Sequence, residues 1–143
     1  MAFPDRIERT IHLNCAQRAV WQALTTSDGL SAWFGEQASI DLRPGGAASI
    51  TFAGGMKVDM RVERVDEPTV FAYTWQLPDL PKDDPRRTYV EFILEPDGDG
   101  TLLRVTESGF AQLPADSRRD SYDSHGEGWT RELAELAAYV DGA

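Results

Sequence analysis

The chain has 143 residues, of which 24 are acidic and 14 basic, so its formal net charge is −10 at neutral pH. That length suits one domain with its own core, and 41% hydrophobic residues is ordinary for a globular protein. The negative charge disfavours nucleic acid and anionic lipid surfaces as partners. Cys15 is the only cysteine, and no signal peptide or apolar run of membrane-spanning length is visible, which indicates a cytoplasmic protein without membrane insertion.

The first part of the chain predicts one strand followed by two short helices. Residues 5–13 alternate between apolar and polar side chains, as a half-buried strand does. Asn14 is expected to cap the first helix, and Gln17 offers a variant of the capping box. The polar cluster at residues 25–28 breaks this helix and can cap a second one, which ends near Trp33.

The middle of the chain alternates with a period of two residues, which predicts strands with one face toward a core. The alternating runs cover residues 56–63, 71–77, 90–95 and 103–107, with glycine, proline and aspartate turns between them. Because short turns join antiparallel neighbours, these runs predict an antiparallel sheet. The segment 78–87, with its three prolines, is predicted to be a longer polar loop.

The last part of the chain predicts one long amphipathic helix with Pro114 in its first turn and Gly142 at its end. One face of this helix repeats at spacings of four and three, at Tyr122, Gly126, Trp129, Leu133, Leu136 and Val140. Gly126 and Gly128 are unusual inside a helix, where glycine costs about 1 kcal/mol relative to alanine. We therefore expect that the sheet or a ligand approaches the backbone near them, or that the helix bends.

These elements predict an α+β helix-grip fold in a single domain over residues 1–143. A curved antiparallel sheet of about six to seven strands would wrap around the long C-terminal helix, because each buries its apolar face against the other. The two short helices after the first strand would close one end. A cavity results wherever the enclosed side chains do not fill the space.

Six short motifs occur in the order found in the START/Bet v 1-like (SRPBCC) superfamily. They are Val20–Thr25, Leu30–Gly35, Pro44–Gly46, Tyr73–Trp75, Val105–Phe110 and Glu127–Trp129. Within the superfamily, the chain resembles the branch named after the C-terminal domain of the heat-shock chaperone ATPase activator. The resemblance covers nearly the whole chain and implies the helix-grip fold. It does not fix a function, because the superfamily includes lipid carriers, hormone receptors and polyketide cyclases.

The sequence lacks the common signatures of cofactor and metal sites. No phosphate-binding G-x-x-x-x-G-K-[ST] loop and no G-x-S-x-G nucleophile elbow is present. The two histidines, His12 and His125, and the single cysteine have no spacing typical of a metal site. Asp123 and Glu127 flank His125 at spacings of two, so the three side chains fan out around a helix. We therefore predict no metal, no cofactor and no assigned catalytic residue.

Glu107 is the most informative polar residue, because alternation with Leu103 and Val105 points it toward the inner face of the sheet. A buried carboxylate costs several kcal/mol unless it is paired, hydrogen-bonded or protonated. Glu107 could contact a ligand or act as a general base at the mouth of a cavity. Alternatively, strand pairing ends before it, or an arginine pairs with it. His125 could hydrogen-bond a ligand or relay a proton, or it could lie in solvent.

The leading functional hypothesis is non-catalytic binding of a small hydrophobic or aromatic molecule, lipid or polyketide-like, in an internal cavity. The candidate ligand-binding residues are Trp33, Met56, Met60, Phe71, Tyr73, Trp75, Phe92, Glu107, Trp129 and Leu133. Trp21 is assigned to core packing. Two alternatives stay open. One is a polyketide cyclase/aromatase-like enzyme that uses Glu107 with His125 or Tyr73. The other is a chaperone-associated interaction module or homodimer whose core is filled.

Overall fold

The structure is a computed structural model that describes residues 5–52, 54–77, 80–81 and 83–141. Its elements follow the predicted order of one strand, two short helices, a meander of strands and one long helix. The bounds are β1 (Arg6–Leu13), α1 (Gln17–Thr25), α2 (Ser27–Trp33), β2 (Gln37–Ile40), β3 (Ala47–Thr51), β4 (Lys57–Asp66), β5 (Val70–Gln76), β6 (Arg87–Asp97), β7 (Gly100–Ser108), a 3₁₀ turn (Phe110–Gln112) and α3 (Ala115–Asp141).

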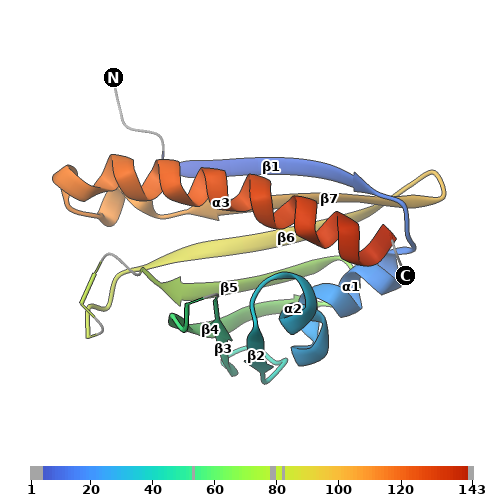
Figure 1. The fold of residues 1–143 in the computed structure, drawn as a ribbon, viewed down its shortest axis with the longest axis horizontal. Helices are drawn as coiled ribbons and strands as arrows, with labels where there is room; N and C mark the ends of the chain where they lie inside the picture. The colour runs from blue at the N-terminus through green and yellow to red at the C-terminus, as the bar shows by residue number, and fades with distance from the viewer. Residues whose placement is uncertain (1–4, 53, 78–79, 82, 142–143) are drawn as a thin grey trace.

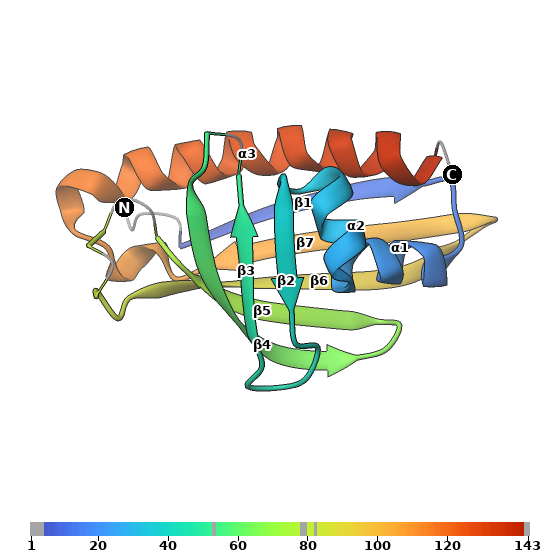
Figure 2. The same cartoon turned by 60° about the horizontal axis from the view of Figure 1, so that its bottom comes forward.

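The seven strands form one antiparallel sheet in the order β1-β7-β6-β5-β4-β3-β2. In Figure 1, α3 runs along the strands of this sheet, and in Figure 2 the sheet curves beneath it. The helices α1 and α2 lie near the C-terminal end of α3 (Figure 2). This arrangement confirms the predicted α+β helix-grip fold.

The core lies between the inner face of the sheet and α3. Strand β7 shows the cause most clearly, because its residues alternate between half-buried and buried along its whole length. The predicted stripe of α3 is buried from Gly126 to Val140, and Tyr122 is half-buried. Burying each large aliphatic or aromatic side chain contributes about 1.5–3 kcal/mol, so this contact holds helix and sheet together. Trp21 is buried in the same core, as predicted. Its ring contacts that of Phe71 edge-on.

The second helix is capped as predicted, but the first is not. The Thr26 hydroxyl accepts a hydrogen bond from Gly29 N at 2.9 Å and caps α2. The cap predicted at Asn14 is wrong, because α1 has Ala16 at its N-cap without a side-chain hydrogen bond. Gln17 instead donates to the carbonyl oxygens of Pro68 and Leu94. Its side chain therefore ties α1 to the sheet rather than completing a capping box.

Two other predictions concern segments that the structure describes only in part. Arg87, placed in the predicted loop, is the first residue of β6. Residues 78, 79 and 82 of that loop lie outside the described residues, as does Gly142, the predicted end of the last helix. Among the helices that the structure describes, none is long and apolar enough to cross a membrane.

Candidate functional site

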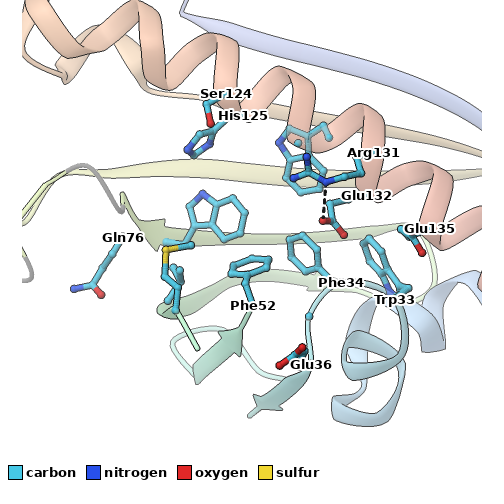
Figure 3. Close-up of a pocket in the computed structure, with 16 residues that line it drawn as sticks. Trp33, Phe34, Glu36, Phe52, Gln76, Ser124, His125, Arg131, Glu132 and Glu135 are labelled. Carbon is cyan, nitrogen blue, oxygen red and sulfur yellow. Dashed lines mark ion pairs between the residues drawn. The ribbon is translucent and has the colours of Figure 1, made fainter. Parts of the chain in front are cut away.

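A cavity of about 600 Å³ lies between the end of α2, the inner face of the sheet and the middle of α3 (Figure 3). Five aromatic side chains line it, namely Trp33, Phe34, Phe52, Trp75 and Trp129. Phe34 is at the centre of this group. Its ring stacks on those of Trp33, Trp75 and Trp129 at centroid distances of 4.8, 5.8 and 5.7 Å. The cavity therefore offers flat apolar surfaces to whatever enters it.

The end of α2 places Trp33 and Phe34 in this wall. The indole nitrogen of Trp33 donates to the Ala23 carbonyl at 2.7 Å, which fixes the ring against α1. Gly35 then allows the chain to pass close to β3. A Cβ on Gly35 would lie 2.7 Å from Ile50 Cγ2 and 2.8 Å from Thr51 O, too close for any other residue without a shift of the backbone.

Behind the wall lies a buried polar group, here called the Glu107 cluster, formed by Glu107, Trp75, Thr88, His125 and Trp129. The Glu107 side chain is 0% exposed. Its carboxylate accepts hydrogen bonds from Trp75 Nε1 at 2.9 Å, Thr88 Oγ1 at 2.5 Å and Trp129 Nε1 at 2.8 Å. His125 Nδ1 lies 2.9 Å from both carboxylate oxygens. Both oxygens are therefore paired, as a buried carboxylate requires.

Three strands and one helix bring the Glu107 cluster together. Trp75 of β5 lies opposite Thr88 of β6, and Glu107 of β7 lies opposite Val90, the next inward residue of β6. His125 and Trp129 are one turn apart on α3 and so project from the same side of the helix. Strand pairing continues through Glu107 to Ser108, and the basic side chain in contact with Glu107 is a histidine and not an arginine, so neither structural alternative considered for Glu107 holds.

Burial, hydrogen bonds and nearby charges shift three pKa values around the cavity. Burial by itself raises the pKa of Glu107, but hydrogen bonds from His125, Thr88 and Trp75 outweigh it, and the net pKa lies below its usual range. Burial, aided by the charges of Glu107 and Glu132, raises the pKa of Tyr73 well above its usual range. The Tyr73 hydroxyl has no hydrogen-bond partner among the described residues. Burial also raises the pKa of Glu132.

The ten predicted ligand-binding residues divide into two groups. Trp33, Met56, Trp75 and Trp129 line the cavity. The others are buried and do not line it, namely Met60, Phe71, Tyr73, Phe92, Glu107 and Leu133. They share the inner face with the lining residues, but their side chains fill the space under α3. The sequence could not separate core from cavity wall, because alternation shows which face of the sheet a residue occupies but not whether other side chains cover it.

Sequence reasoning missed Phe34, Phe52 and a set of charged residues in the cavity lining. Phe34 entered the sequence analysis only as part of the Leu30–Gly35 motif, although its position beside Trp33 was a signal. Arg131, Glu132 and Glu135 are not among the residues of the predicted apolar stripe of the last helix. Glu132 follows Gly128 by one helical turn, which is the spacing that could have placed it on the cavity side.

The two helical glycines have different surroundings. The sheet or a ligand was expected to approach them, and each glycine fits one of these two alternatives. At Gly126 the sheet approaches, since Arg9 Nη2 lies 3.4 Å from the Gly126 carbonyl and would be 3.2 Å from an added Cβ. Gly128 lines the cavity, and an added Cβ would meet only Arg131 Nη2 at 3.9 Å.

Within the described part of the chain, no three His, Cys, Asp or Glu side chains group as metal ligands would.

Similar structures support the fold over nearly the whole chain. Protein MLL2253 from Mesorhizobium loti is 25% identical with a TM-score of 0.82, over 96% of this chain and 98% of that one. The Aha1 dimer from Colwellia psychrerythraea is 22% identical with a TM-score of 0.78, over 95% and 96%. DynU16, from the dynemicin biosynthetic locus, is 20% identical with a TM-score of 0.80, over 96% of this chain and 48% of its own.

A comparison with curated proteins found no significant match to this chain. The family described as Activator of Hsp90 ATPase homolog 1-like protein matches residues 14–141. That match begins just after β1 and runs to the last residue of α3, so it includes every element that forms the cavity. The chain therefore belongs to the Activator of Hsp90 ATPase homolog 1-like family, within the START/Bet v 1-like superfamily.

Proposed function

We propose that this protein binds a small, mainly apolar molecule with a flat ring system, lipid-like or polyketide-like, in the cavity beneath α3. The observation that carries the proposal is that Phe34, Trp75 and Trp129 stack on one another and together line the cavity. Phe34 lies within 27° of parallel to Trp75 and within 22° of parallel to Trp129. A volume of about 600 Å³ falls in the range of small-molecule sites. Near-parallel rings favour stacking against a planar ligand.

The mouth of the cavity supports the same proposal. Met56 lines it and is 47% exposed, so part of its side chain is accessible to a ligand that enters from solvent. A flexible thioether at this position can adapt its conformation to ligands of different outline. Gly128 keeps the α3 side open, because an added Cβ would meet no atom closer than 3.9 Å.

The proposal is tested by titrating the protein with N-phenyl-1-naphthylamine, a neutral fluorescent probe of apolar cavities, and by a thermal-shift screen of aromatic polyketides, flavonoids and lipids. A ligand at about one hundred times its Kd adds about 2.7 kcal/mol of stability. Gly128→Leu should weaken binding of the probe by narrowing the cavity beside α3. Ala134→Leu, an exposed site on the same helix outside the cavity lining, is the matched control. No binding by the wild type, or equal binding by Gly128→Leu, would contradict the proposal.

One observation favours a second candidate function, a cyclase/aromatase-like enzyme. His125 lines the cavity, and its imidazole is within hydrogen-bond reach of the buried Glu107 carboxylate. A carboxylate in that position can orient an imidazole for proton transfer to or from a bound substrate. The test is turnover of linear aromatic polyketide analogues, and turnover that persists in Glu107→Gln would rule this candidate out.

We further propose that the chain is a single domain that acts in the cytoplasm and forms a homodimer. The unpaired Cys15 supports a reducing compartment. A similar structure, the Aha1 protein from Colwellia psychrerythraea, is a dimer. Light scattering of the purified chain at several concentrations tests the dimer, and a constant monomer mass would refute it.

A further inference from the structure

Acidic side chains form part of the lining of this cavity. Among the described residues, the lining includes Glu36, Glu132 and Glu135 and one basic residue, Arg131, so these side chains carry two excess negative charges when His125 is neutral. In Figure 3, Glu132 and Glu135 extend from α3 toward the side of the cavity that Trp33 and Phe34 form. A neutral, apolar ligand needs none of these charges in the cavity lining, so a charged ligand would better explain why they are there.

Glu132 is the acidic residue best placed to contact a ligand. Its side chain is 16% exposed, whereas its ion-pair partner Arg131 is 71% exposed at a distance of 3.8 Å. The arginine is therefore mostly in water, where a surface ion pair contributes little. The carboxylate is left in a partly desolvated position without an equally buried positive charge. A cation inside the cavity would supply that charge.

The aromatic wall suits the same kind of ligand. The faces of Trp and Phe rings attract cations that lie within about 6 Å of the ring centroid, and tryptophan is the best of these rings. Trp33, Trp75 and Trp129 all line the cavity. The formal net charge of −10 adds a field that attracts cations toward the protein and repels anions.

We infer that the ligand of this cavity is a cation, a protonated amine or quaternary ammonium carried by an apolar, ring-containing body, with Glu132 as its counter-ion. This inference rests on the proposed function and narrows its ligand class. The body lies in the cavity against the wall that Phe34, Trp75 and Trp129 form. The ammonium group lies at the α3 side, between the Glu132 carboxylate and the ring faces.

The test uses three compounds with one body and three charges: 4-phenylbutyltrimethylammonium, 4-phenylbutanol and 4-phenylbutanoate. Their Kd values are measured by tryptophan fluorescence and calorimetry on the full chain. The cation should bind at least about tenfold tighter than the alcohol, and the anion should bind weakest. In Glu132→Gln, the affinity for the cation should fall to within about twofold of that for the alcohol, which itself stays unchanged.

Glu127→Gln is the matched control, because Glu127 is an exposed glutamate of the same helix outside the cavity lining. It should keep the preference for the cation, since general charge attraction alone would weaken equally in both variants. If cation and alcohol bind with equal Kd values, and Gly128→Leu weakens the binding of both, the cation inference is overturned and the proposed function stands. If none of the three compounds binds while N-phenyl-1-naphthylamine does, the inference is again overturned alone. If nothing binds, both fail.

Discussion

Glu107 and Glu132 are two carboxylates on the same side of the sheet, and the fold treats them in opposite ways. Glu107 has no exposed surface and is contacted by four side chains within 2.9 Å. Glu132 is partly buried and has one mostly exposed ion-pair partner at 3.8 Å. Their pKa values accordingly move in opposite directions, down for Glu107 and up for Glu132. The first carboxylate is compensated within the fold, and the second is compensated only in part.

This difference separates a structural role from a binding role. Paired buried charges are costly to break, because removing one partner leaves the others desolvated and unsatisfied. The Glu107 cluster therefore fixes the positions of Trp75 and Trp129, two of the rings that line the cavity. Glu132 can change partners at little cost, which suits contact with a ligand.

The largest effect should come from Glu107→Ala. It removes the carboxylate that Trp129, Thr88 and His125 contact and one of the two acceptors of Trp75 Nε1, and it creates a cavity. We expect a loss of about 3–5 kcal/mol in the free energy of unfolding, measured in urea. Glu95→Ala, an exposed change on β6, should cost less than about 0.5 kcal/mol. A loss below about 1 kcal/mol for Glu107→Ala would mean that the cluster does not organise the core.

Glu107→Gln should cost about 2 kcal/mol at pH 7, because an amide loses the charge-assisted hydrogen bonds and turns donors toward donors. The folded pKa of Glu107 lies below the unfolded value of 4.5. Its contribution is therefore fully present above pH 4.5 and is lost as the pH falls through the folded pKa. The stability gap between wild type and Glu107→Gln should narrow below pH 4.5 in urea titrations. A stability gap that widens below pH 4.5 would mean that folding raises the pKa of Glu107 instead of lowering it.

Tyr73→Phe should stabilise the protein by about 1 kcal/mol. The Tyr73 ring is 1% exposed, and its hydroxyl has no partner among the described residues, so removing it relieves a desolvation cost. Tyr139→Phe, at a 42% exposed position, should change the free energy of unfolding by less than about 0.5 kcal/mol. Clear destabilisation by Tyr73→Phe would show that the hydroxyl is hydrogen-bonded in solution.

Gly128→Ala should stabilise α3 by about 0.5–1 kcal/mol, because alanine favours a helix and the added Cβ meets nothing closer than 3.9 Å. Gly126→Ala should gain less, since its Cβ would lie 3.2 Å from Arg9 Nη2. Thermal unfolding of both variants measures the difference. Equal gains would mean that Arg9 moves aside without cost.

Glu132→Gln should have the smallest effect, between no change and about 0.5 kcal/mol of stabilisation at pH 7. Burial raises the folded pKa of Glu132, so its charged form destabilises the folded state. This cost is fully present once the pH exceeds the folded pKa. The amide removes that cost and keeps the shape. A loss comparable to that of Glu107→Gln would erase the contrast between the two carboxylates.

Much of the fold could be predicted from the sequence, and part of the site could. Period-two runs predicted five of the seven strands, all but β2 and β3, and the stripe from Gly126 to Val140 predicted the buried face of α3. Alternation also placed Glu107 on the inner face, which the structure confirms. The cap at Asn14 failed because two residues separate it from the first residue of α1.

The amino-acid sequence by itself determined which face of each strand and helix is apolar, because that follows from local periodicity. Only the tertiary structure decided which inward residues fill the core and which line the cavity. It also decided that His125 and Trp129 of α3 meet Glu107 of β7, Trp75 of β5 and Thr88 of β6. Those contacts depend on strand register and on where α3 crosses the sheet. Residues far apart in the chain set both, so no local pattern can encode them.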